Sequence, residues 1–196
     1  IINGPSPYVE FYVDDVMIIP ATASPTFQPT TLSPTPPGAP LEYVYNGDME
    51  GSTHWWEDCC GDHIELTSTT EQSYEDNHSL LVSNRINYWD GPSQDLIGRL
   101  IQPGKYEMSA WMRIKDPNTN LSSQARFFID QSDESGTTYY YPSYIPQRTH
   151  VTTIYSDKWT RVWGVIDFNV NGTISRLNLR FSLEADALYD FYVDSV

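Results

Sequence analysis

Positive charge is scarce in this sequence. Only 11 of its 196 residues are lysine or arginine, against 26 aspartates and glutamates, so the formal net charge is −15 at pH 7. Such a chain has little with which to neutralise a row of phosphates, which argues against nucleic acid and anionic membrane surfaces as partners. Neutral glycans, cations and other proteins remain.

Long apolar runs and catalytic signatures are missing as well. No run of 18 apolar residues occurs, so we expect no membrane insertion, and we expect any signal peptide to lie upstream. The chain has no nucleophile-elbow serine motif, no metalloprotease helix motif and no glycine-rich phosphate loop. We therefore predict that this chain is not an enzyme.

Cysteine is nearly absent, and the two that occur, Cys59 and Cys60, are adjacent. Three outcomes are open: a vicinal disulfide, bridges to another chain, or free thiols, of which the last fits an oxidising compartment least well. A zinc site that adds Asp62 and His63 is disfavoured, because consecutive cysteines lack the loop that usually separates metal ligands.

A repeated string gives the domain organisation. The sequence FYVDDV at 11–16 returns as FYVDSV at 191–196. We interpret residues 1–19 as the C-terminal strand of a preceding module and residues 41–196 as the next module of a tandem array. Partners would then include neighbouring repeats or subunits of the same protein, with which the strand at 8–17 can pair.

The segment 20–40 between these parts contains seven prolines interspersed with threonines. It favours polyproline II and predicts a stiff, O-glycosylated linker. Three N-glycosylation sequons, at Asn77, Asn120 and Asn171, also point to a secreted, extracellular protein.

From residue 41 onward the hydrophobic period is two, and turn signals recur about every ten residues. This pattern predicts an all-β module folded as a two-sheet, jelly-roll β-sandwich. Strands are expected at 42–46, 63–70, 79–86, 94–100, 105–115, 125–131, 137–145, 148–155, 159–169, 174–184 and 189–196.

Five sequence blocks carry a resemblance to a known group. They are NGDMEG at 46–51, SLLVSNR at 79–85, WDGP at 89–92, YEMSAW at 106–111 and FYVD at 191–194. In this order they resemble the carbohydrate-binding modules of families 4, 9 and 22. The resemblance implies a non-catalytic β-sandwich that tethers a glycoside hydrolase to xylan, β-glucan or a related polysaccharide.

Candidate sugar contacts follow from aromatic chemistry and from the resemblance. Six tryptophans, fourteen tyrosines and seven phenylalanines exceed what one core needs, and exposed rings stack on the C–H faces of pyranoses. Trp89, beside a turn, matches a stacking tryptophan of the xylan-binding group, or else it is a buried core residue. Tyr140 is the second aromatic candidate, and its alignment with the xylan-binding group is uncertain by one residue. The alternative is that it belongs to a row of tyrosines on an edge strand. Glu184 matches a glutamate that accepts hydroxyl hydrogen bonds.

Arg85 either orients Asp90 or faces solvent at the rim of this site. The xylan-binding group has tyrosines where this chain has Arg180 and Ser182, and an arginine expected before Ile64 has no counterpart. These departures predict a ligand other than xylan. The alternative function is a structural repeat of an extracellular fibre or cell-surface assembly whose glycan site has drifted.

The resemblance also implies a structural calcium ion that fastens the first strand to the last. Glu50 and Asp194 would supply carboxylates, and carbonyl groups near Asp48 and Glu75 would complete the shell. Calcium takes six to eight oxygen ligands, which fits this donor set. Solvent-exposed surface charge is the alternative explanation for these acidic residues.

Overall fold

The computed structural model describes residues 43–60, 63–100, 102–116, 120–142, 151–169, 172–184 and 188–196. Within these ranges the chain forms eleven β-strands, and no helix is long and apolar enough to cross a membrane. The expected strand at 8–17, the linker at 20–40 and the sequon at Asn171 lie outside the described residues. The prediction of an all-β, two-sheet module is confirmed.

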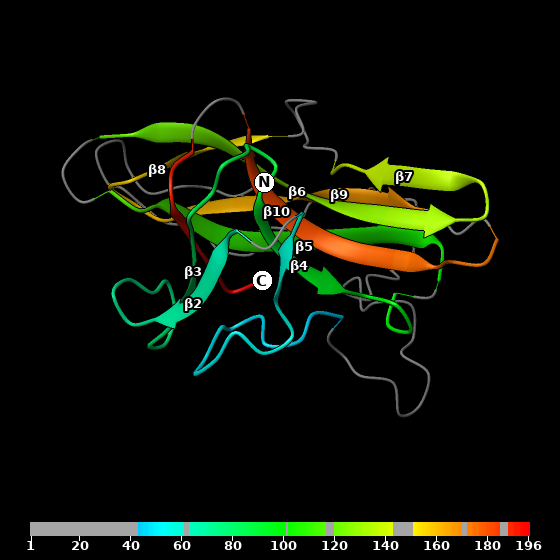
Figure 1. The fold of residues 1–196 in the computed structure, drawn as a ribbon, viewed down its shortest axis with the longest axis horizontal. Coiled ribbons are helices and arrows are strands. Elements are labelled where there is room, and N and C mark those ends of the chain that lie inside the picture. The colour runs from blue at the N-terminus through cyan, green and yellow to red at the C-terminus, as the bar shows by residue number, and fades with distance from the viewer. Residues whose placement is uncertain are drawn as a thin grey trace, which may run out of the picture. The chain divides into compact units, whose positions relative to one another are not determined.

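One sheet has six antiparallel strands (Figure 1). Its order is β1 (Glu57–Cys59), β4 (Gly91–Asp95), β10 (Arg176–Glu184), β6 (Ser122–Asp133) and β7 (Gly136–Tyr140), with β8 (Thr152–Tyr155) also paired to β6. The other sheet has five strands: β2 (Glu65–Thr69), β3 (Ser79–Ser83), β11 (Phe191–Asp194), β5 (Gly104–Ile114) and β9 (Thr160–Phe168).

The core lies between the two sheets and draws on both. Strand alternation places every second side chain of β10 and β5 in it, as period-two sequences require. On β10 these are Leu177, Leu179, Phe181 and Leu183, and on β5 Ala110, Met112 and Ile114, all at most 1% exposed. The intervening residues of β10 therefore lie on the outer face of the six-stranded sheet.

Two predicted strands are wrong, and both errors involve β4. Residues 43–48 form turns and bends rather than the strand expected at 42–46. The Gln94 side chain accepts a hydrogen bond from the Tyr45 amide at 2.7 Å and donates one to the Tyr45 carbonyl at 2.8 Å, so these backbone groups are not available to a neighbouring strand. The strand expected at 94–100 instead runs from Gly91 to Asp95. It ends where the carbonyl of Leu96 accepts hydrogen bonds from the amides of Arg99 and Leu100, forming a tight turn.

Of the adjacent Trp55 and Trp56, one ring lies in the core and the other is exposed. Trp56 is 5% exposed and packs near Phe181, with its indole N–H donating to the carbonyl of Asn46. Trp55 is 50% exposed and has a positive φ of 75°. Residues 55–56 precede the short strand β1, which the sequence did not predict.

Candidate functional site

The outer face of the six-stranded sheet is rich in polar side chains, and we call it the β10 face. It carries side chains of β10, β6 and β7: Arg176, Asn178, Arg180, Ser182, Glu184, Arg126, Phe128, Asp130 and Tyr139. Register fixes this set, because residues directly opposite each other in an antiparallel pair point to the same side. Glu184, predicted as a sugar contact, lies on this face.

Two ion-pair clusters occupy the β10 face. Arg126 pairs with Glu184, and its Nε donates to the Ser182 hydroxyl at 3.2 Å. Arg180 Nη2 lies 2.5 Å from Asp130 Oδ2, and Arg176 Nε lies 3.4 Å from Asp130 Oδ1. The Asp130 side chain is fully buried beneath these two guanidinium groups.

Aromatic rings border the same face at the β7 edge. Tyr139 is 51% exposed and stands opposite Asp130 in the strand register. Tyr141 lies beside it with the rings stacked at 6.5 Å, and both rings approach the buried Phe128. This edge offers tyrosine rings to a ligand lying across the β10 face.

Tyr140, the predicted second stacking residue, points the other way. It stands opposite the core residue Ile129, its ring contacts Phe168, and its hydroxyl donates to the Asn169 carbonyl at 2.6 Å. Burial raises its pKa. Tyr140 therefore does not reach the β10 face, whereas its two neighbours, Tyr139 and Tyr141, approach Phe128 on that face.

Trp89 sits in residues 86–90, the segment immediately before β4, which we call the Trp89 loop. Its ring is 42% exposed and meets Tyr88, also 42% exposed, edge-on at 4.7 Å. The alternative of a buried core tryptophan is wrong. The pairing of β4 with β10 sets Ser93 opposite Arg180, so the chain that precedes β4 lies toward the Glu184 end of β10.

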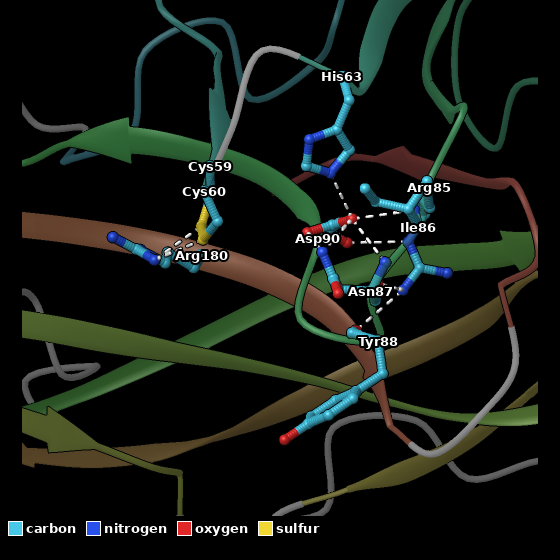
Figure 2. Close-up of polar contacts among 9 residues, drawn as sticks. All are labelled: Cys59, Cys60, His63, Arg85, Ile86, Asn87, Tyr88, Asp90 and Arg180. Atoms are coloured by element: carbon cyan, nitrogen blue, oxygen red, sulfur yellow. Dashed lines mark hydrogen bonds and ion pairs between the residues drawn. A yellow bond between two sulfur atoms is a disulfide. The ribbon is translucent and has the colours of Figure 1, made fainter.

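A buried carboxylate holds the Trp89 loop in shape (Figure 2). Asp90 Oδ2 accepts hydrogen bonds from the amides of Ile86 and Asn87 at 3.0 and 2.7 Å, and it pairs with His63 Nε2 at 2.7 Å. Burial opposes ionisation of Asp90, but these hydrogen bonds outweigh it and lower its pKa. The anion therefore organises the loop.

Arg85 also holds the Trp89 loop in place. Its side chain is 4% exposed, so the alternative in which it faces solvent is wrong. The guanidinium donates to the carbonyls of Asp90, Tyr88 and Tyr189 at 2.8–2.9 Å, and its plane approaches the Phe191 ring at 5.1 Å. Burial lowers its pKa to about 10, against the opposing effect of nearby carboxylates. Arg85 is a positioning residue.

Cys59 and Cys60 are joined in a vicinal disulfide, one of the three outcomes left open by the sequence. Arg180 Nη1 lies 2.7 Å from the sulfur of Cys59 and 3.0 Å from that of Cys60, which places the disulfide against the β10 face (Figure 2). His63 is engaged by Asp90, and Asp62 lies outside the described residues.

The predicted calcium ligands gather around one loop, residues 74–78. Glu50 Oε1 accepts from the amides of Asn77 and His78 at 2.9 and 2.7 Å, while Asp194 Oδ2 accepts from those of Tyr74 and Glu75 at 2.7 and 3.2 Å. Asp48 caps the Glu50 amide at 3.3 Å, and Glu75 accepts from the Ser195 hydroxyl at 3.2 Å.

Burial raises the pKa of Asp194, and the negative charge of Glu50 raises it further. In the part of the chain that the structure describes, no group of three or more acidic, histidine or cysteine side chains is arranged to hold a metal ion. The oxygen-rich donor set fits calcium by its chemistry. Asn77 in this loop and Asn120 are both exposed, as a glycosylated asparagine must be.

Sequence reasoning missed several residues of the β10 face. Tyr139 and Tyr141 lie one position on either side of the predicted Tyr140. Which of these tyrosines face outward depends only on which side of the strand packs on the core. Arg126 and Asp130 gave no signal of their own, because their pairing with β10 joins segments about 50 residues apart in the chain.

Comparisons with known proteins place the chain in a family. A family model described as a carbohydrate binding domain matches residues 41–188. Endo-1,4-beta-xylanase A of Thermoanaerobacterium saccharolyticum is 24% identical over 98% of this chain, and exoglucanase XynX of Acetivibrio thermocellus is 23% identical over 78%. The matched regions span 14% and 13% of those two proteins.

Solved structures share the fold. A xylan-binding domain from CBM 22, formally the x6b domain, has a TM-score of 0.62 at 22% identity and covers 78% of this chain and 90% of that one. The CBM22-1 xylan-binding domain of Paenibacillus barcinonensis Xyn10C has a TM-score of 0.61 at 21% identity, with coverage of 76% and 86%. The chain belongs to the carbohydrate-binding domain family and is a non-catalytic carbohydrate-binding module.

Proposed function

We propose that this module binds a polysaccharide of the xylan and β-glucan class across the β10 face. The observation that carries the proposal is a pair of exposed aromatic residues, Tyr139 at 51% on β7 and Trp89 at 42% in the loop before β4, which come from opposite sides of β10 in the sheet order. Relatives described as xylanases and xylan-binding domains support the ligand class.

The chemistry of the β10 face suits a sugar chain. Tyr139 and the Trp89 ring would stack on the C–H faces of pyranoses at separate points along the glycan, while Glu184 would accept hydrogen bonds from hydroxyl groups. Arg126 orients that carboxylate through their ion pair. Because Arg180 adds a charge and a set of donors to the centre of the face, we expect the preferred glycan to differ from unsubstituted xylan.

A structural calcium ion completes the proposal. Glu50 and Asp194 would supply the carboxylates, and backbone carbonyl oxygens near Asp48 and Glu75 would complete the coordination shell. Burial, and after it the negative charge of Glu50, raise the pKa of Asp194, and a divalent cation would offset both effects. The ion would also tie residues 48–50, loop 74–78 and β11 together.

We further propose an extracellular, modular setting. The alignment with the xylanase extends over 98% of this chain and so includes part of the segment before residue 41, which agrees with a tandem array. Neighbouring repeats are the partners proposed for residues 1–19, and an attached catalytic domain is proposed from the much greater length of the relatives.

The test is affinity electrophoresis on xylan, β-1,3-glucan, mixed-linkage glucan and mannan. We expect retardation on at least one polymer and its loss in Trp89→Ala and Tyr139→Ala. The matched control is Trp163→Ala, because Trp163 stands opposite Ser109 in the other sheet and should leave retardation unchanged. If no polymer retards the folded wild-type protein, the fibre alternative replaces this proposal.

A further inference from the structure

Positive charge, scarce in the chain as a whole, is concentrated on the β10 face. Three of the chain's 11 basic residues, Arg126, Arg176 and Arg180, lie there within two adjacent strands. A cluster of three arginines is unusual in a chain with a net charge of −15. The concentration favours an anionic group beside it, either from the protein or from a ligand.

Two carboxylates make direct ion pairs with these three arginines. Arg126 is matched by Glu184, but Arg176 and Arg180 share the single carboxylate of Asp130. The register also turns Asp95 and Glu57 toward this side of the sheet, though neither forms an ion pair with the three arginines. The Asp130 carboxylate is fully buried, whereas the Arg176 side chain is 44% exposed, so a ligand at this point meets a guanidinium group.

Arg180 also has hydrogen-bonding capacity to spare. Its Nη2 pairs with Asp130, but its Nη1 faces the two disulfide sulfurs, which are weak acceptors. Its buried Nε has no hydrogen-bond partner among the described residues. The nearest acidic neighbour at the β4 edge, Asp95, uses Oδ1 to cap the Ile97 amide at 2.8 Å.

We propose that Arg176 and Arg180 bind the carboxylate of a uronic acid residue carried by the glycan. This inference rests on the proposed function of the β10 face. Tyr139 stands opposite the Asp130 that anchors both arginines, so a pyranose stacked on its ring would bring a carboxylate at C5 toward them. The planar guanidinium fork matches a carboxylate better than a neutral hydroxymethyl group.

The net charge further narrows the ligand class. A fully acidic polysaccharide would be repelled by the −15 charge at long range, but screening confines that field to about 8 Å at physiological salt. Isolated uronates on an otherwise neutral backbone gain the local contact with little of the repulsion. The ligand is thus a neutral chain with scattered uronic acid branches.

The experiment compares one polymer in two states: glucuronoxylan with its uronate carboxyl groups intact and the same polymer with those groups chemically reduced to alcohols. Isothermal titration at low salt should show about tenfold tighter binding of the intact polymer, the size expected for one charge-assisted contact. Raising the salt concentration should narrow the gap between the two polymers.

Arg176→Gln should lower the affinity for intact polymer toward that for reduced polymer, with the remaining preference due to Arg180, and should leave the affinity for reduced polymer unchanged. The matched control is Arg161→Gln, whose side chain is 47% exposed on the other sheet and lies 3.8 Å from Glu107. Equal wild-type affinities for the two polymers would overturn the uronate inference and leave the proposed function standing. Absence of binding to both by folded protein would overturn both.

Discussion

Arg85→Lys tests whether the Trp89 loop depends on a buried guanidinium. The Arg85 side chain is 4% exposed and donates to the carbonyls of Asp90 at 2.9 Å, Tyr88 at 2.9 Å, Tyr189 at 2.8 Å and Asn87 at 3.3 Å. A lysine keeps the charge but replaces the planar fork by one ammonium group. It can satisfy only part of this set of carbonyls.

The magnitude follows from the hydrogen bonds that an ammonium group cannot make. A hydrogen bond to a charged group contributes about 1.5–3 kcal/mol, and we expect the lysine variant to lack the equivalent of two. The free energy of unfolding should therefore fall by about 3–6 kcal/mol. At about 2–4 °C per kcal/mol for a domain of this size, the melting temperature should fall by roughly 6–24 °C.

The assay is urea unfolding followed by tryptophan fluorescence, with glycan affinity measured well below the melting temperature. Because the loop presents Trp89, affinity should fall together with stability. Arg161→Lys, exposed on the other sheet, is the control and should change stability by less than about 0.5 kcal/mol. If Arg85→Lys behaves like Arg161→Lys, the guanidinium does not hold the loop.

Three further predictions concern the same framework. Gly91→Ala should destabilise the module by about 3 kcal/mol or more in urea, because a Cβ there would overlap the Phe181 carbonyl, whereas Gly104→Ala meets only the Tyr106 ring at 3.8 Å and should be tolerated. Because folding lowers the pKa of Asp90, its carboxylate stabilises the fold fully above the ordinary pKa of 3.8, and this stability is lost as the pH falls through the lower pKa of the folded state. Asp90→Asn should therefore make the melting temperature fall less steeply as the pH is lowered through this range. Calcium at 100 times its dissociation constant should add about 2.7 kcal/mol of stability, which a chelator or Asp194→Asn removes; an unchanged melting temperature would eliminate the ion.

The fold was predictable where a strand's own side chains carry the pattern. In β10, apolar residues alternate with polar ones over nine positions, and the structure buries the apolar set; β5 shows the same alternation except at Trp111. Strand β4 has the sequence Gly-Pro-Ser-Gln-Asp, which has no strand propensity. Its conformation comes from pairing with β1 on one side and β10 on the other, which a local pattern cannot reveal.

The orientation of the candidate site residues depends on the same local pattern. Glu184 lies on the outer face of the sheet because it extends the alternation of β10. Tyr140 points inward to Phe168, and Tyr139 points to the opposite side of β7. Three consecutive tyrosines give no indication of which side of the strand will face the core. The role of Arg85 depends on the Tyr189 carbonyl, which lies 104 residues away in the sequence.

The β10 face is organised before any ligand arrives, and this affects specificity. Arg126 with Glu184, and Arg180 with Asp130, are already paired, and the Trp89 loop is held by Asp90. Binding therefore orders few side chains, which limits its entropic cost. Under the proposed function, a sugar hydroxyl would compete with these ion pairs for the same atoms, so a neutral ligand would gain little at Arg180, whereas a carboxylate would add an anion beside Arg176 and Arg180. Selection among glycans at this face would then be made by charge at its centre and by ring stacking at its edges.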